Sequence, residues 1–137
     1  MAKSISHHDA LIYAMVTMSA VDRTMTDAEL ARIGNIVNNL PVFRDFDAEQ
    51  LVQTAEDCGE ILSAEGGLDR VLDLIASTVP KKLHETAYAL AVEVAAADLA
   101  VGQEELRLLE MIQDKLHIDA LTKAAIERGA RARHSVV

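Results

Sequence analysis

The chain has 137 residues, a length that suits one domain, and half of its residues are hydrophobic, which excludes an intrinsically disordered chain. Its formal net charge of −9 disfavours binding to the phosphates of nucleic acids and to anionic lipid, so we expect neither as a partner. A single cysteine, Cys58, excludes an internal disulfide framework and a cysteine-based metal cluster.

Apolar residues recur at helical spacing through almost the whole chain, and no two-residue hairpin signal separates alternating runs. Because aromatic residues make up only 3% of the chain, the core must be built from Leu, Ile, Val, Met and Ala, which is typical of packed helices. We therefore predict an all-α fold, a single domain over residues 1–137 built as a bundle of about seven helices. In chain order, the expected apolar faces lie at 11–18, 30–40, 51–62, 68–75, 83–94, 109–116 and 121–125.

Several of these helices have recognisable N-terminal caps. Thr26 with Glu29, and Asp47 with Gln50, have the spacing of a capping box, in which the side chain of each residue bonds the backbone N–H of the other. Asp119 is a suitable N-cap for the last helix.

Helix ends and one central helix are also predicted. Pro41 ends the second helix, because proline cannot continue one, and the Gly66-Gly67 pair ends the third. The stretch 87–97 is apolar nearly all round, so we expect this helix to lie at the centre with neighbours on several sides.

Neither a signal sequence nor a membrane span is indicated. The N-terminus lacks an apolar signal core, and the longest nearly apolar run, 86–101, is interrupted by Glu93 and Asp98. That run is too short and too charged to cross a bilayer. We expect a cytoplasmic protein without direct membrane insertion.

One segment of the sequence is weakly repeated. SAVDRTMTDAEL, at 19–30, returns as AAADLAVGQEEL, at 95–106, and this alignment pairs Asp22 with Asp98 and Glu29 with Glu105. Each copy is expected to form a helix, a short acidic corner and a second helix. The chain is therefore predicted to contain two pseudo-repeated helical hairpins.

The double acidic corner, and above all the stretch AVEVAAADLAVGQEELRLLEMIQDKLHI, resembles the TerB-like helical domain. That family repeats A-x-A-D-G-x-h-x-x-x-E corners on an all-α scaffold, and the resemblance runs over about residues 10–118. It implies a non-enzymatic cytoplasmic module linked to tellurite and other stress resistance. It also implies a divalent cation, calcium or magnesium, at the corners, where the matching residues are Asp22, Glu29, Asp98 and Glu105.

The same carboxylates have a simpler explanation. Glu29 belongs to a predicted capping box, and Glu105 stands in a first helical turn, where the helix dipole favours negative charge. Arg23 and Leu99 replace the family's glycine after each aspartate. The alternative is therefore a metal-independent helical adaptor or oligomerisation module, with a protein partner or a second copy as its ligand.

No catalytic constellation is recognisable, and we expect no enzyme. Cys58 falls on an apolar helix face, which favours a buried structural residue over a nucleophile. The adjacent His7 and His8 are expected in solvent at a helix start. The basic residues after position 127 are expected to form a solvated helix end. The alternative is a C-terminal tail that docks on another surface.

Overall fold

The computed structural model describes residues 5–21, 25–97 and 102–137, and the regular structure in these residues is entirely helical, as predicted. Three short 3₁₀ helices, Pro41–Phe43, Ala48–Gln50 and Lys81–Leu83, join longer elements. The seven longer helices are α1 (His7–Ala20), α2 (Asp27–Asn39), α3 (Leu51–Ser63), α4 (Gly67–Thr78), α5 (His84–Ala97), α6 (Gln103–Leu116) and α7 (Ala120–His134).

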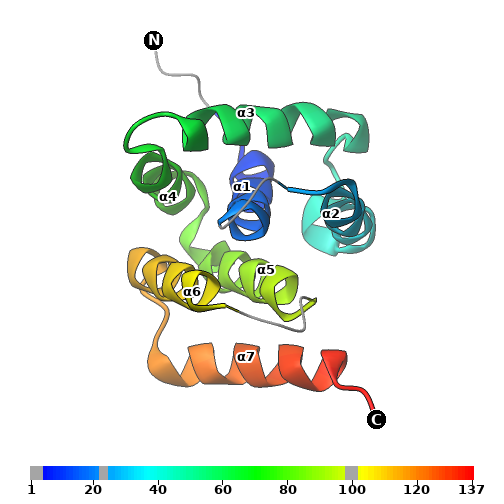
Figure 1. Ribbon diagram of the computed structural model, residues 1–137, viewed down its shortest axis with the longest axis vertical. Coiled ribbons are helices and arrows are strands. Elements are labelled where there is room, and N and C mark those ends of the chain that lie inside the picture. Colours follow the sequence, from blue (N-terminus) through cyan, green and yellow to red (C-terminus); the bar gives the residue numbers. More distant parts are fainter. Residues whose placement is uncertain (1–4, 22–24, 98–101) are drawn as a thin grey trace.

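Two helices, α1 and α5, form the axis of the bundle (Figure 1). They pack against each other, α3 and α4 cover α1 on one side, and α6 and α7 cover α5 on the other. The prediction that 87–97 lies centrally is confirmed by the burial of Ala87, Tyr88, Ala91 and their neighbours. The stretch 10–19 of α1 is equally buried, although the sequence suggested only a single apolar face there.

The predicted caps are confirmed where they depend on local geometry alone. Thr26 and Glu29 form a reciprocal capping box at the start of α2, and Asp119 accepts a 2.8 Å bond from the backbone N–H of Thr122 at the start of α7. Helix α2 ends at Asn39, and Pro41 starts a 3₁₀ turn.

Two local predictions are wrong in detail. Asp47 and Gln50 do not form the predicted capping box, because the Asp47 side chain caps a 3₁₀ turn by accepting a 3.0 Å bond from the N–H of Glu49. Helix α3 begins only after that turn. Gly66 does not end α3, which stops at Ser63; instead Gly66 takes a left-handed conformation (φ 69°) as the N-cap of α4.

One histidine ties three helices together at the end of the bundle where α5 begins. The Nε2 of His84 lies 3.0 Å from the carbonyl oxygen of Val79, the C-cap of α4, and its Nδ1 lies 3.2 Å from that of Leu116, the last residue of α6. Two helix C-termini, each the negative end of a dipole, thus meet the first residue of α5. In the described part of the chain, no helix is long and apolar enough to cross a membrane.

Candidate functional site

The acidic corners predicted from the sequence join α1 to α2 and α5 to α6. In both, the second helix starts at an equivalent position, because Asp27 and Gln103, the first residues of α2 and α6, are aligned with each other in the two sequence copies. Glu29 and Glu105 thus occupy the third position of their helices. Residues 22–24 and 98–101 of the corners lie outside the described residues, and they include Asp22, Arg23, Asp98 and Leu99.

Glu29 has the capping role that its spacing predicted. Its Oε1 accepts a 2.9 Å bond from the backbone N–H of Thr26, and its own N–H donates to the Thr26 hydroxyl over 3.2 Å. The side chain is half-buried. A negative charge at the positive end of the α2 dipole stabilises the helix start.

Glu105 repeats this arrangement in a more buried setting. Its Oε1 accepts a 3.3 Å bond from the backbone N–H of Gly102, the N-cap of α6, and only 7% of the residue is exposed. Among the described residues it is the one charged side chain in the buried class. Burial of a carboxylate is costly unless it is paired, so Glu105 is held where its helix N-terminus stabilises it.

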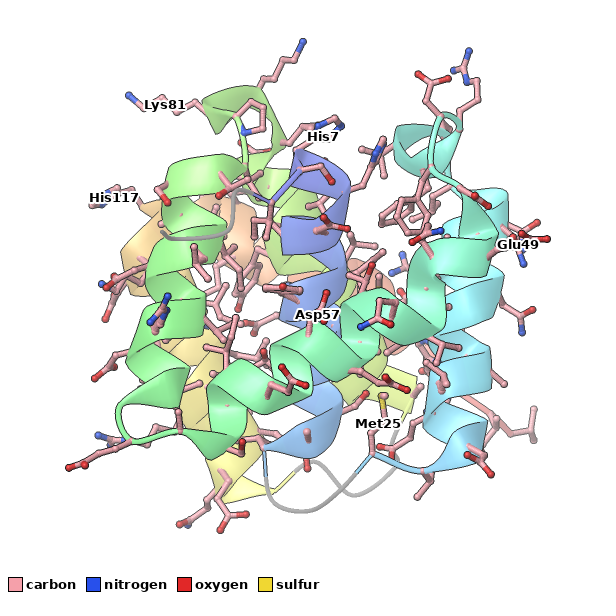
Figure 2. All side chains as sticks on the ribbon, turned by 90° about the horizontal axis from the view of Figure 1, so that it is seen from above. His7, Met25, Glu49, Asp57, Lys81 and His117 are labelled. Carbon is pink, nitrogen blue, oxygen red and sulfur yellow. The ribbon has the colours of Figure 1, made fainter. Side chains whose placement is uncertain are left out.

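Helices α2 and α6, which carry the two glutamates in their first turns, start at the same end of the bundle, because α1 and α5 run in the same direction (Figure 2). His7 and Lys81 mark the end where these two helices begin, and Met25, just before α2, marks the opposite end. The proximity of the two helix starts also shows in the pKa of His7, which burial lowers most and the charges of His8 and Lys82 lower further.

Hard cations take oxygen ligands and favour carboxylates. Of the four predicted ligands, each corner has one among the described residues, Glu29 or Glu105, already engaged at its helix start. Calcium takes six to eight ligands, so more oxygens are needed than these two residues provide. Within the described ranges, no three His, Cys, Asp or Glu side chains are grouped to hold a metal ion.

The repeat extends further than the sequence indicated. The Thr17 hydroxyl lies 3.6 Å from the Cys58 sulfur, joining α1 to α3. When the alignment of the two copies is continued without a gap, Thr17 corresponds to Glu93 and Cys58 to His134, and this second pair joins α5 to α7. Helices α1, α2 and α3 therefore have α5, α6 and α7 as their structural counterparts. The sequence alone did not reveal the correspondence of α3 with α7, because the aligned side chains of these two helices differ in size and polarity.

The basic C-terminal segment is partly docked, which corrects the expectation of a solvated helix end. Arg133 and His134 both pair with Glu93 on α5. Burial acts to raise the pKa of Glu93, but hydrogen bonds and charges from Arg133 and His134 outweigh it and lower that pKa below its ordinary value. The interaction favours the ionised carboxylate, so it is lost as the pH falls through the lowered pKa.

Cys58 is structural, as predicted. It is 0% exposed, and its thiol lies 3.9 Å from the carbonyl oxygen of Tyr13. Burial raises the pKa of the thiol to about 11, although a hydrogen bond from Thr17 opposes the rise. The thiolate, which is the reactive form, is therefore scarce at neutral pH.

We expect Cys58 to resist a water-soluble disulfide reagent such as DTNB in the native protein at pH 8. Modification should proceed no faster than the protein opens, and it should become rapid in denaturing urea. Absorbance at the colour band of the released thiolate checks this. Rapid stoichiometric labelling without denaturant would contradict the buried position.

The N-terminal histidines are not the solvent pair that the sequence suggested. Both His7 and His8 are half-buried. The Nε2 of His8 lies 2.9 Å from the carbonyl oxygen of Val42, and its ring lies near Phe43 and Phe46, with centroids 6.0 and 5.6 Å away. The aromatic neighbours come from the segment after α2, so no local pattern revealed them.

Comparison with known proteins supports the resemblance seen in the sequence. The family model described as Tellurite resistance protein TerB matches residues 8–128, which covers most of the chain and all seven helices in whole or in part. No curated protein and no solved structure matches this chain.

Proposed function

Since this chain belongs to the TerB family, we propose that it is a non-catalytic cytoplasmic binding module of tellurite and stress resistance, and that its two acidic corners hold a divalent cation, calcium or magnesium. The observation that carries the proposal is the matched placement of Glu29 and Glu105. Both occupy the third position of a helix, and both helices start at the same end of the bundle.

The proposed cation ligands are the carboxylates that the repeat pairs with each other: Asp22 with Asp98, and Glu29 with Glu105. A bound cation would supply positive charge that holds these carboxylates together, and it would thereby order the surface that a partner meets. Carboxylate oxygens are the ligands that calcium and magnesium prefer. The buried position of Glu105 supports the second corner in particular, because a poorly solvated carboxylate gains most from a cation.

A non-catalytic role is supported by the chemistry of Cys58, the one thiol of the chain. A buried thiol whose pKa is about 11 is a poor nucleophile and a poor soft ligand for heavy elements. Capture of tellurium by protein thiolates is therefore not the mechanism that we propose.

The cation is tested by thermal melts of protein stripped with EDTA, repeated with calcium or magnesium up to millimolar concentration. A ligand at 100 times its dissociation constant stabilises the fold by about 2.7 kcal/mol, so we expect the midpoint to rise by several degrees. The double variant Asp22→Asn with Asp98→Asn should abolish the rise. A rise of equal size in that variant would place the cation elsewhere.

A matched control removes the same charge at the other end of the bundle. Asp45→Asn with Asp114→Asn changes two exposed aspartates, one just after the 3₁₀ helix that follows α2 and one near the end of α6. This control should keep the full cation response. A flat response in the unmodified protein would overturn the cation proposal.

The second candidate is a metal-independent adaptor, and a specific observation favours it. Thr26 and Gly102 already donate their backbone N–H groups to the two described glutamates, so these carboxylates have a structural role without any metal. The positive charge of Arg23, next to Asp22 in the sequence, also favours the metal-independent adaptor, because it repels a bound cation. In this case the module acts through protein contacts alone.

A further inference from the structure

The two halves of the repeat differ in one seam, which is the line where the third helix of each half (α3 or α7) packs against the other two. In the first half, α3 closes the seam beside α1 and α2 with apolar side chains. Leu51, Ala55 and Cys58 of α3 are all buried, as is Ile33 of α2. Leu51 also reaches Gly34 on α2, where a Cβ would lie 3.6 Å from its Cδ2. This seam is part of the core.

In the second half, the residues of α7 that align with Leu51, Ala55 and Cys58 are ionisable: Glu127, Arg131 and His134. Ionisable side chains cannot be packed into a seam as Leu, Ala and Cys are, because burying a charge without a partner is costly. The seam therefore stays open. It forms a groove of about 370 Å³ between α6 and α7, with α5 beneath.

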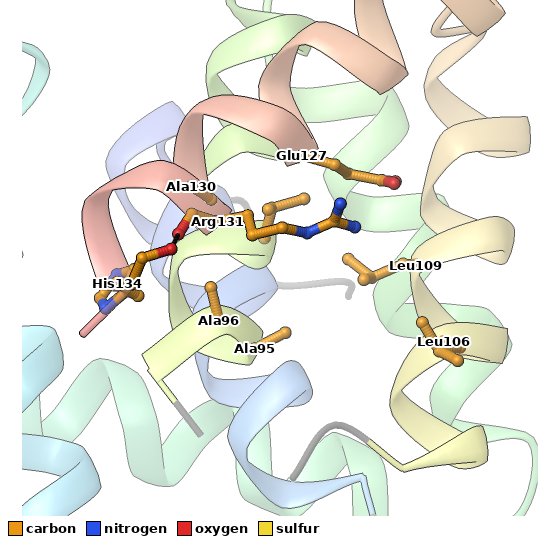
Figure 3. A pocket seen from close by; sticks show the side chains of 10 residues that line it. Ala95, Ala96, Leu106, Leu109, Glu127, Ala130, Arg131 and His134 are labelled. Atoms are coloured by element: carbon orange, nitrogen blue, oxygen red, sulfur yellow. Dashed lines mark hydrogen bonds between the residues drawn. The ribbon is translucent and has the colours of Figure 1, made fainter. Parts of the chain in front are cut away.

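The floor of this α5–α6–α7 groove and its α6 wall are apolar, whereas the α7 wall also carries Glu127, Arg131 and His134 (Figure 3). Ala95 and Ala96 of α5 form part of the floor, Leu106 and Leu109 project from α6, and Ala130 lies on α7. Leu106 is 52% exposed, so its side chain offers uncovered aliphatic surface at the groove, whereas Ala95, Leu109 and Ala130 are buried. A trough bounded by two helices and floored by small side chains has the form that receives a third helix through its apolar stripe.

The free charge at the rim of the groove is positive. Glu127 is already engaged, since its Oε2 accepts a 2.6 Å bond from the Tyr88 hydroxyl and lies 3.0 Å from the Lys123 ammonium. His134 pairs with Glu93. The exposed Arg131 guanidinium makes no ion pair with any described residue, so it remains available at the rim.

We propose that the α5–α6–α7 groove binds an amphipathic helix of a partner protein whose apolar stripe is flanked by acidic side chains, with Arg131 as the charged anchor. The proposal rests on the binding role proposed above and names the class of partner. A symmetric pair of copies meeting through this groove would bring two Arg131 rims together, and like charges at an interface are unfavourable.

The probes are two synthetic helical peptides of about 20 residues, long enough to hold a helix when stapled. They share one leucine stripe and differ only in flanking residues, glutamate in one and lysine in the other. Each is titrated into ¹⁵N-labelled full-length protein in EDTA at physiological salt. We expect the acidic peptide to shift the amide signals of Ala95, Leu106 and Ala130, and the basic peptide to leave them unchanged.

Two pairs of variants separate the groove from general effects. Arg131→Glu should weaken acidic-peptide binding by about tenfold or more, whereas Arg128→Glu, the same charge change on an exposed residue of α7 outside the groove, should weaken it by less than about threefold. Leu106→Ala should also weaken binding, whereas Val52→Ala should not, although both side chains are 52% exposed.

Equal binding of the two peptides, shifts confined to another face, or self-association that protects Leu106 would each overturn the proposal. Because the titration is done without metal, its failure leaves the cation response of the melts intact. Conversely, a flat melt leaves the peptide result unaffected. The two proposals therefore fail separately.

Discussion

Replacing Gly67 with alanine is expected to destabilise the protein by about 3 kcal/mol or more. A Cβ at this first residue of α4 would lie 2.0 Å from the backbone oxygen of Ile61 and 2.9 Å from the carbonyl carbons of Ile61 and Leu62. These are backbone atoms at the end of α3, so no side-chain rotation can relieve the clash. The free energy of unfolding in urea measures the loss.

Gly59→Ala is the matched control, since it adds the same methyl group to a glycine inside α3. A Cβ there meets nothing within 4 Å, so the variant should gain about 0.5–1 kcal/mol from the better helix propensity of alanine. Opposite signs for the two variants are the expected result. Two changes of the same sign and size would show that α3 and α4 do not approach as closely as described.

Truncating Leu11 to alanine is expected to cost 2–5 kcal/mol, roughly the range for a leucine removed from a packed core. Leu11 is 0% exposed on α1, a helix that is buried on every side over residues 10–19. The removed atoms leave a cavity inside a helix that packs against α3, α4 and α5, and a close-packed interior closes such a cavity only in part. Urea unfolding again provides the measurement.

The same substitution at Leu121 supplies the comparison. That side chain is 81% exposed in the first turn of α7, so Leu121→Ala should change the unfolding free energy by no more than about 0.5 kcal/mol. If Leu11→Ala were equally mild, α1 would not lie at the centre of the bundle as described.

The two halves of the repeat have different roles, because α3 and α7 pack with different kinds of side chain. The first half uses Leu51, Ala55 and Cys58 to complete the core. The second half has ionisable side chains at those positions, and the paired Glu93 and His134 still hold α7 against α5. One copy of the arrangement thus contributes mainly stability, while the other leaves a surface on which a partner can act.

Part of the candidate cation site could be predicted from the sequence, and part is visible only in the structure. The spacing of Thr26 and Glu29 was enough to place Glu29 in the first turn of a helix, and the repeat transferred that position to Glu105. The burial of Glu105, in contrast, depends on how α6 packs against α5 and α4, and no pattern within the corner expresses it.

The sequence by itself determined the helices, most of their ends and the family. Helical periodicity, the Thr26–Glu29 box, the Asp119 cap and the stop at Pro41 all depend on residues within one or two turns of each other, and such interactions are the same in any fold. Only the tertiary structure decided which residues far apart in the chain meet. The burial of α1 on all sides, the docking of His134 on Glu93, the close approach at Gly67 and the open groove beside Arg131 follow from the packing of helices against one another, and that packing leaves no local signal in the sequence.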